Sequence, residues 1–144
     1  MILDANVLLY ARNRDDPRSE RAREFLEQVL NGPYRVGLPW QTLTAFLRIA
    51  THPRVFPRPL TPDQAASQVE AWLGAPASWV PVPGPDHASV LLGLVRDLRL
   101  TGALISDAQL AALALENGVG IWSSDSDFAR FPGLHWEDPI RVTG

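Results

Sequence analysis

The chain has 144 residues, of which 46% are hydrophobic and 20% charged, and its formal net charge at pH 7 is −3. This length suits a single domain with a sizeable core, and the negative charge argues against nucleic-acid binding driven by overall charge. The absence of cysteine excludes disulfides, thiolate metal sites and cysteine nucleophiles, and the three scattered histidines disfavour a histidine-rich metal site. Any bound metal would have oxygen ligands, which favours magnesium or manganese.

Apolar segments are short throughout the sequence. None approaches the length of a membrane span, and no signal peptide is recognisable ahead of the first predicted strand. We therefore expect a cytoplasmic protein with no membrane association.

The first predicted element is a short buried strand, Met1–Leu3, which runs directly into Asp4 and then into a helical stretch. In open α/β sheets, ligands bind at the carboxyl ends of the strands, so an acid placed there faces the site. Asp4 by itself is equally well explained as the N-cap of the following helix.

The first half of the chain continues with helices whose ends are marked by capping residues. Asp16-Pro17 is an N-cap followed by proline at the first helical position, and Thr61-Pro62-Asp63-Gln64 is a capping box. Gly32 and Gly74 follow the apolar periodicity and are expected to end these two helices. The expected elements are a helix over 17–30, a strand over 34–38, a helix over 40–50, a loop over 51–60 and a helix over 62–73.

The second half again alternates strands and helices. A second capping box, Ser106-Asp107-Ala108-Gln109, is expected to open a helix that ends near Asn117-Gly118. The other expected elements are strands over 79–83 and 119–123, a last strand within 134–142, and a helix over 86–98 with Val90, Leu91, Leu94, Val95 and Leu98 on its buried side. This alternation predicts an α/β fold: a single domain over residues 1–144, with a central parallel sheet flanked by helices on both faces.

Four aspartates lie where predicted strands end or helices begin. Asp4 follows the first strand, Asp107 opens a helix, and Asp125 and Asp127 follow the strand over 119–123. Because parallel strands end at one edge of a sheet, these carboxylates can converge there. Close carboxylates repel one another unless a cation lies between them, so the cluster predicts a magnesium or manganese site that activates water for attack on a phosphodiester. Taken singly, Asp107 is also explained by its capping box, and Asp125 and Asp127 by an Asx-type turn.

Other acid-rich α/β families need residues that this sequence does not contain. A phosphoacceptor receiver domain and a haloacid-dehalogenase-type phosphatase both need a lysine, and every positively charged side chain here is arginine. The phosphatase also needs an aspartate two residues after its first, where this chain has Asn6. No glycine-rich phosphate-binding motif is present, which argues against a mononucleotide-binding fold.

Three segments carry the four aspartates: LDANVLLY over Leu3–Tyr10, SDAQLAALA over Ser106–Ala114, and SSDSDF over Ser123–Phe128. In that order and spacing they resemble the opening strand, the D-x-x-[IL]-A-A-x-A motif and the [ST]-x-D-x-D-F motif of the PIN-domain ribonucleases. The resemblance is specifically to the VapC-type toxins of type II toxin–antitoxin systems. The stretch Phe46–Phe56 is similar to a branch of that family common in mycobacteria.

This resemblance implies a metal-dependent endoribonuclease that acts as a toxin and hydrolyses RNA with a metal-activated water. The implied cofactor is magnesium or manganese, and the implied partners are RNA, a cognate antitoxin and a second copy of the chain. The implied catalytic residues and direct or water-mediated metal ligands are Asp4, Asp107, Asp125 and Asp127, with Asn6 and Ser123 in support.

One departure from the family lies in the helix over 40–50. Most members carry a glutamate there, in a pattern like T-x-x-E-x-x-R, and aligning Thr42 and Arg48 with that pattern places Ala45 at the glutamate position. No other acid occurs between Glu27 and Asp63. We therefore expect weaker metal binding that disfavours a second metal ion. The alternative function is a non-catalytic PIN-fold binding protein that lost turnover through this replacement.

Several arginines border the predicted site. Arg48, Arg54 and Arg58 are candidates to hold RNA phosphates, and a solvated or carboxylate-paired role is the alternative.

Aromatic residues on the neighbouring helices allow two interpretations. By resemblance, Trp40, Phe46 and Trp72 lie on or beside helices that would line an antitoxin groove, whereas core packing is expected for at least two of them. The histidines, expected to be structural or at the surface, are His52, His87 and His135.

Overall fold

The computed structural model describes residues 1–141, in which short strands alternate with helices. The strands are β1 (Ile2–Leu3), β2 (Val36–Gly37), β3 (Ser78–Trp79), β4 (Ile121–Trp122) and β5 (Trp136–Glu137). The helices are α1 (Ala5–Arg12), α2 (Ser19–Leu30), α3 (Trp40–Ala50), α4 (Pro62–Leu73), α5 (His87–Leu98), α6 (Leu104–Glu116) and the 3-10 helix η1 (Ser126–Arg130). No helix in this described range is both long and apolar enough to cross a membrane.

The strands form one sheet in the order β3-β2-β1-β4-β5, and every neighbouring pair is parallel. The central strand β1 places Ile2 opposite Ile121 and Leu3 opposite Trp122 of β4. The backbone N–H of Asp4 donates to the carbonyl of Trp122 at 3.0 Å, so the pairing continues to the point where both strands end. The predicted parallel sheet is confirmed, and the ends of β1 and β4 lie side by side.

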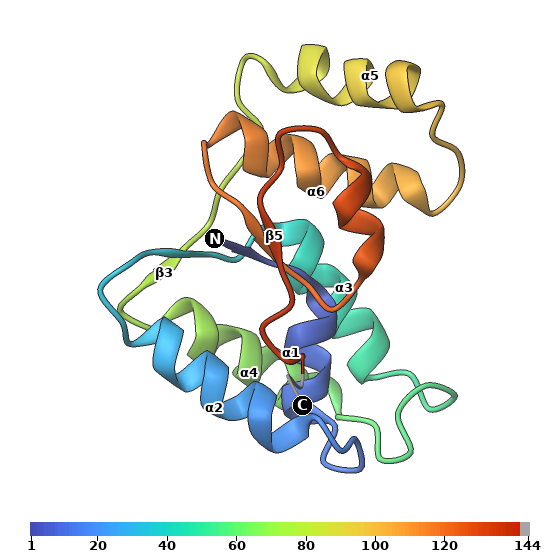
Figure 1. Cartoon of the computed structure of the whole chain (residues 1–144). Helices are drawn as coiled ribbons and strands as arrows, with labels where there is room; N and C mark the ends of the chain where they lie inside the picture. The colour runs from blue at the N-terminus through green and yellow to red at the C-terminus, as the bar shows by residue number, and fades with distance from the viewer. Residues whose placement is uncertain (142–144) are drawn as a thin grey trace.

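Helices cover both faces of the sheet, as predicted (Figure 1). Successive residues of a strand point to opposite faces, and Ile2 and Leu3 are both 0% exposed. Leu3 packs into a cluster built with α1, α2, α3 and α4, whereas Ile2 packs into a second cluster built with α6 and η1. Complete burial of side chains of this size contributes about 1.5–3 kcal/mol each, so both clusters anchor β1.

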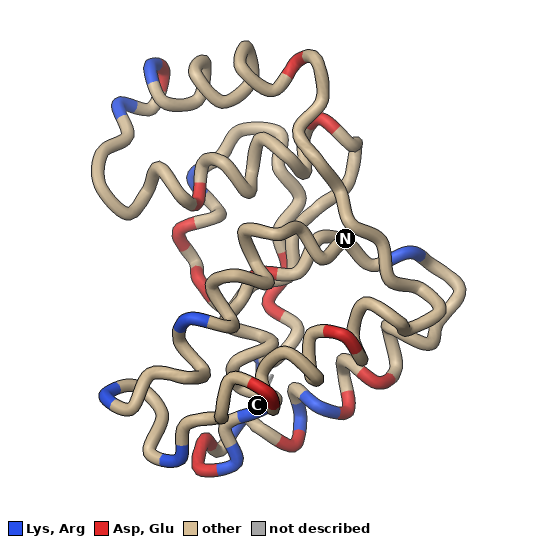
Figure 2. Tube along the Cα trace, turned by 180° about the vertical axis from the view of Figure 1, so that it is seen from behind, with Lys and Arg blue, Asp and Glu red and all other residues tan. Residues whose placement is uncertain are grey.

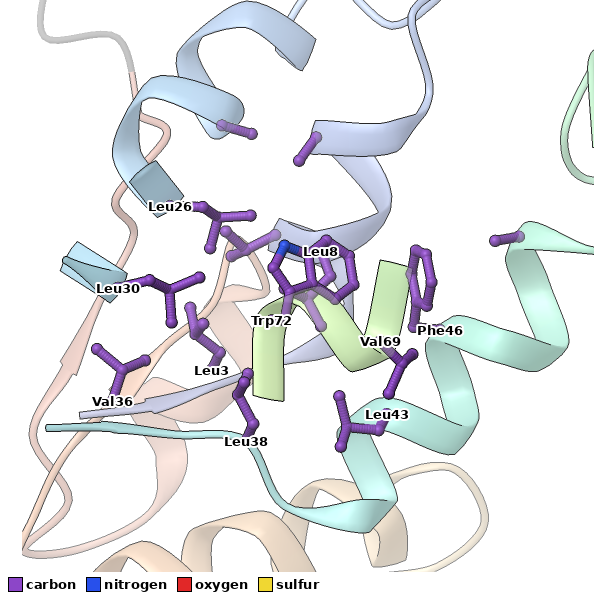
Figure 3. Packing of buried hydrophobic residues seen from close by; sticks show 14 of the residues in the cluster. Leu3, Leu8, Leu26, Leu30, Val36, Leu38, Leu43, Phe46, Val69 and Trp72 are labelled. Atoms are coloured by element: carbon purple, nitrogen blue, oxygen red, sulfur yellow. The ribbon is translucent and has the colours of Figure 1, made fainter. Parts of the chain in front are cut away.

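The larger cluster contains two of the three aromatic residues considered above (Figure 3). The rings of Phe46 and Trp72 meet edge to face, with 4.7 Å between their centroids, and both residues are buried. Trp40, at the start of α3, is 53% exposed. Core packing is therefore confirmed for two of the three.

Helix α2 begins at Ser19, so the predicted start at Asp16-Pro17 is wrong. The carboxylate of Asp16 accepts from the backbone N–H of Arg18 at 2.8 Å and pairs with its guanidinium at 2.8 Å. The carbonyl of Asp16 also accepts from the N–H of Ser19 at 3.0 Å. Asp16 therefore closes a turn ahead of the helix and does not cap it.

The predicted capping box at Ser106 is also wrong, because α6 begins at Leu104 and its N-cap position is Ala103, which makes no side-chain cap bond. Gly102 adopts a φ of +60° and its carbonyl accepts from the N–H of Ile105 at 3.1 Å, which starts the helix earlier. Asp107 consequently lies in the first turn of α6. The predicted end holds, with Asn117 at the C-cap and Gly118 at a φ of +65°.

Helix α5 has no buried residue, which corrects the expected buried side over residues 86–98. It packs on α6, on the side away from the sheet (Figure 1), because α6 already covers that part of the sheet. The expected core positions Val90, Leu91, Leu94, Val95 and Leu98 are all half-buried.

The start of α4 agrees with the sequence prediction, whereas the end of β3 does not. The capping box at Thr61 is confirmed: its hydroxyl accepts from the N–H of Gln64 at 3.1 Å, and the Gln64 side chain accepts from the N–H of Thr61 at 2.9 Å. The strand expected over 79–83 is shorter, because β3 ends at Trp79, two residues before Pro81. The last strand is β5, and residues from 142 onward of its expected range lie outside the described part.

Candidate active site

Asp4 lies at the junction of β1 and α1, where its two carboxylate oxygens have different partners. Oδ1 accepts from the backbone N–H of Ala5 at 2.8 Å, so the capping interpretation is correct for that oxygen. Oδ2 accepts from the hydroxyl of Ser123 at 2.7 Å and lies 3.4 Å from the side-chain nitrogen of Asn6. Capping thus occupies one oxygen, and the other points toward the end of β4.

Ser123 connects the two strand ends. It is 0% exposed, and its hydroxyl accepts from Asn6 Nδ2 at 3.0 Å and from the backbone N–H of Asp125 at 3.0 Å while donating to Asp4. The carbonyl oxygen of the Asn6 side chain accepts from the N–H of Ser124 at 3.3 Å. Asn6 and Ser123 therefore hold the Asp4 carboxylate and the start of the β4–η1 turn in one hydrogen-bond network.

Asp107, Asp125 and Asp127 form a carboxylate cluster beside this network. One oxygen from each lies within 4.8 Å of the others, and all three side chains are half-buried. Asp125 Oδ1 also accepts from the N–H of Asp127 at 2.9 Å, which confirms the Asx-type turn at Asp125. Asp127 pairs with Arg130 at 3.0 Å. The structure thus brings three of the four predicted acids together, and Asp4 is not a member of that closest group.

The acids nevertheless share one electrostatic environment. Burial, followed by the negative charges of Asp125, Asp4 and Asp127, raises the pKa of Asp107 to about 6, while the charge of Arg130 opposes this rise. Burial also raises the pKa of Asp4, with a smaller contribution from Asp125, against the hydrogen bonds from Ser123 and Ala5. The site therefore carries an excess of negative charge, and its carboxylate oxygens are the atoms available to bind a metal ion. This donor set fits a hard divalent cation.

A cavity of about 310 Å³ adjoins Asp4 and Asp107. Its other lining residues are Ala5, Gln41, Thr42, Thr44, Ala45, Arg48 and Ser106. Ala45, which the sequence alignment places at the family glutamate position, therefore faces the same space as two of the predicted acids.

The three arginines expected near the site have different surroundings. Arg48 lines the cavity, whereas Arg58 pairs with Asp15 at 2.7 Å, so the carboxylate-paired interpretation is correct for Arg58. Arg54 is exposed in the loop after α3. Most positively charged positions lie around α1, α2 and that loop (Figure 2).

Three contacts around the site were not predicted from the sequence. The Gln41 side chain donates to the carbonyl of Ser106 at 2.7 Å, and the Thr42 hydroxyl donates to the carbonyl of Leu3 at 2.7 Å. Both hydrogen bonds join α3 to neighbouring elements, and no sequence pattern predicts them. The Asp127–Arg130 pair has i,i+3 spacing, a signal that can be read from sequence.

The histidines have structural or surface positions, as expected. His87 bonds to Glu116 and His135 to Glu137, while His52 is exposed and accepts from the N–H of Arg54. None of these side chains lines the cavity beside the acids.

A family model described as "PIN domain" matches residues 1–134. The chain belongs to the PIN-domain family. Its parallel sheet is therefore that of a PIN domain, and the resemblance seen in three short motifs extends over nearly the whole chain.

Relatives with high identity come from mycobacteria. The PIN domain is 43% identical to "Ribonuclease VapC37" of Mycobacterium tuberculosis, over 96% of each chain. The mycobacterial-like branch predicted from Phe46–Phe56 is confirmed by this relative.

Solved structures share the fold at lower identity. VapBC2 from Rickettsia felis, bound to a DNA fragment from its promoter, superposes with a TM-score of 0.70 at 16% identity, covering 94% of this chain and 96% of that one. A toxin–antitoxin complex from Klebsiella pneumoniae gives 0.66 at 18% identity and covers 98% of both chains. These structures share the fold of this chain over nearly the whole of the given sequence.

Proposed function

We propose that this protein is a magnesium- or manganese-dependent endoribonuclease, acting as the toxin of a toxin–antitoxin pair. The observation that carries the proposal is the cluster of three carboxylates within 4.8 Å, next to Asp4 at the carboxyl end of β1. A 43% identical relative is named a ribonuclease, and it matches over 96% of its length. The reaction is hydrolysis of an RNA phosphodiester bond by water, in a single domain over residues 1–144.

In this proposal, Asp107, Asp125 and Asp127 hold the metal ion, and Asp4 holds it directly or through a water molecule. When bound, such an ion lowers the pKa of a coordinated water and neutralises charge on the phosphate. Oxygen ligands on the protein suit magnesium or manganese. With Ala45 in place of an acid, the residues present suit one ion better than two.

Neighbouring side chains fix the acids in position. Ser123 and Asn6 bond to the Asp4 carboxylate, and the i,i+3 pair with Arg130 orients Asp127. Arg48, at the cavity wall, supplies positive charge that favours the approach of RNA to a chain with a net negative charge.

An antitoxin is the proposed protein partner. A cavity of about 460 Å³ between α1, α2 and α4 is lined by Arg12, Arg14 and Arg23 and by the apolar surface of Trp72 and Leu26. Arg12 Nε is buried without a hydrogen-bond partner among residues 1–141, so a carboxylate from an acidic and apolar antitoxin segment would satisfy it.

The remaining assignments concern assembly and location. We assign a homodimer, supported by Leu92 of α5, which is 47% exposed, and by the other large apolar side chains of α5, which α6 leaves only half-buried. Size-exclusion chromatography with light scattering tests this state. The protein is assigned to the cytoplasm, because its proposed substrate, RNA, is found there.

The decisive experiment measures cleavage of labelled RNA with manganese by the wild type, Asp4→Asn and Asp107→Asn. Both variants should lose at least about 100-fold in rate, and Asp63→Asn, an exposed acid in α4, serves as the matched control. Wild-type protein that cleaves nothing supports the alternative, a non-catalytic PIN-fold protein. Cleavage that is unchanged by Asp4→Asn contradicts the proposed site.

The partner is tested separately by co-expressing the chain with the product of a small reading frame immediately upstream of its gene. Co-purification, weakened by Arg12→Ala, is the expected result. Failure to co-purify would contradict the antitoxin assignment and leave the catalytic assignment unaffected.

A further inference from the structure

We propose that the cavity beside Asp4 and Asp107 takes one nucleoside of the RNA, adjacent to the phosphate that is cleaved, and that Arg48 selects guanine there. This inference rests on the proposed function and adds a base preference to it. It depends on the shape of the cavity, the free hydrogen-bonding groups on its wall and an exposed aromatic ring on the helix that forms that wall.

One wall of the cavity is a single face of α3. Gln41, Thr44, Ala45 and Arg48 follow one another at i, i+3, i+4 and i+7, the spacing that places residues on one side of a helix. The opposite side is formed by Asp4 and Ala5 at the start of α1 and by Ser106 and Asp107 in α6. The cavity therefore has an acidic side and a side with no acid.

The size of the cavity suits one nucleoside. Its volume, about 310 Å³, lies at the lower end of the range of about 300–1,000 Å³ typical of small-molecule sites. Ala45, in the middle of the α3 wall, adds only a methyl group, and a longer side chain there would occupy the space. With a phosphate at the acidic side, the nucleoside attached to it reaches the α3 wall.

The wall offers an arginine with unused donors. Arg48 makes no ion pair within residues 1–141, and its guanidinium carries five N–H donors in a fixed planar arrangement. The Thr44 hydroxyl is already bonded to the carbonyl of Trp40 at 2.8 Å. The bond from Gln41 to the carbonyl of Ser106 fixes the amide and leaves its side-chain oxygen as an acceptor.

This pattern matches guanine better than the other bases. Guanine presents two adjacent acceptors, O6 and N7, which pair with both arms of an arginine, whereas adenine presents a donor beside N7. Guanine also carries N–H donors on its other edge, which the Gln41 oxygen can accept. Arg48 is therefore assigned as a specificity-determining residue.

The exposed ring of Trp40 extends this site. Trp40 lies four residues before Thr44 on α3 and is 53% exposed, so it borders the same face of the helix. Exposed aromatic rings stack on nucleic-acid bases without regard to sequence. Trp40 is thus placed to stack on the neighbouring base while Arg48 selects the one in the cavity.

The first test sequences the ends of fragments produced from a random RNA pool by the wild-type protein with manganese. The expected result is an enrichment of guanine at one position flanking the cut, reduced about tenfold in Arg48→Lys, which cannot pair with two acceptors at once. Arg96→Lys, on α5, is the matched control. The proposal is overturned if neither flanking position favours guanine, or if Arg48→Lys leaves the preference intact.

A second test needs no cleavage. Guanosine 5′-monophosphate is titrated into the protein, and the methyl signals of Ala5 and Ala45 are followed by NMR, with adenosine 5′-monophosphate for comparison. The guanosine nucleotide should shift both signals at lower concentration, and Ala45→Gln should abolish the shift of Ala5 by filling the cavity. Ala66→Gln, on the exposed side of α4, controls for the substitution itself.

The two tests separate the possible failures. If the wild type cleaves no RNA but the guanosine nucleotide shifts Ala45, the proposed function fails and the nucleoside site stands. If the protein cleaves RNA and neither nucleotide shifts Ala45, the nucleoside site is refuted and the proposed function stands. Unchanged manganese binding by Ala45→Gln, measured by calorimetry, shows that the variant is folded and keeps its acids.

Discussion

The hydroxyl of Ser123 donates to Asp4 Oδ2 at 2.7 Å, a bond between residues 119 positions apart in the sequence. It joins the ends of the neighbouring strands β1 and β4. Because Ser123 also accepts from Asn6 and from the N–H of Asp125, one buried hydroxyl orders three parts of the site. The position of Asp4 relative to the other acids therefore depends on this serine.

Ser123→Ala should lower the free energy of unfolding by about 1–3 kcal/mol, because it leaves buried polar groups without partners. It should also raise the pKa of Asp4 further, since the Ser123 hydrogen bond lowers that pKa. Chemical denaturation and NMR titration of the Asp4 carboxyl check the two effects. Ser126→Ala, at an exposed position of η1, is the control, and a cost below about 0.5 kcal/mol for Ser123→Ala would contradict the central role of its hydroxyl.

Without metal, the protein should lose stability as the pH rises from about 4 to about 6. The pKa of Asp107 is about 6 in the folded chain against an ordinary value of 3.8, so in this window the folded state binds more protons than the unfolded state. The raised pKa of Asp4 acts in the same direction. Thermal unfolding in the presence of a chelator, measured across this pH range, gives the slope of stability against pH.

Asp107→Asn should remove part of that slope and stabilise the metal-free protein at pH 7 by about 1 kcal/mol, after allowance for solvent screening. With manganese present the wild type should be the more stable of the two proteins, because it gains stability from binding the ion. Asp63→Asn should leave the slope unchanged. If the Asp107→Asn variant were less stable than the wild type at pH 7, both without metal, the proposed repulsion among these acids would be wrong.

Ala45→Glu should bind manganese about tenfold more tightly than the wild type, because it adds a carboxylate to the wall facing Asp4 and Asp107. Calorimetry should give one ion for each wild-type chain. Ala45→Gln, similar in size but uncharged, should keep the wild-type affinity. A clear stoichiometry of two in the wild type would refute the inference drawn from the alanine.

Phe46→Ala should cost about 3–5 kcal/mol of stability, since it removes a fully buried ring and its edge-to-face contact with Trp72. Trp40→Ala removes an aromatic residue of the same helix that is 53% exposed, and should change stability by about 0.5 kcal/mol or less. Denaturant unfolding of both variants measures the difference. Equal costs would mean that the ring of Trp40 is also packed.

The sequence predicted those features that depend on short-range rules. The apolar run into Asp4 identified the central strand, the box at Thr61 identified the start of α4, and Gly118 identified the end of α6. Each of these signals is contained in a few neighbouring residues. The order of the four acids along the chain was likewise sufficient to place them at one edge of a parallel sheet.

The errors arose where distant packing decides the outcome. The apolar periodicity of α5 predicts a buried side, yet whether another element covers that side depends on where α6 lies. The capping pattern at Ser106 falls inside a helix that Gly102 allows to start earlier. Contacts such as Gln41 to Ser106 join α3 to α6 across 65 positions, and no local pattern encodes them.

The placement of β1 beside β4 has a consequence for the time at which the protein becomes active during its synthesis. Asp4 is synthesised well before Ser123, which orients it, and well before Asp125 and Asp127, which follow Ser123. A nascent chain that lacks β4 cannot assemble the acids. The proposed nuclease is therefore inactive on the ribosome that makes it until the segment from Ser123 to Asp127 has been added.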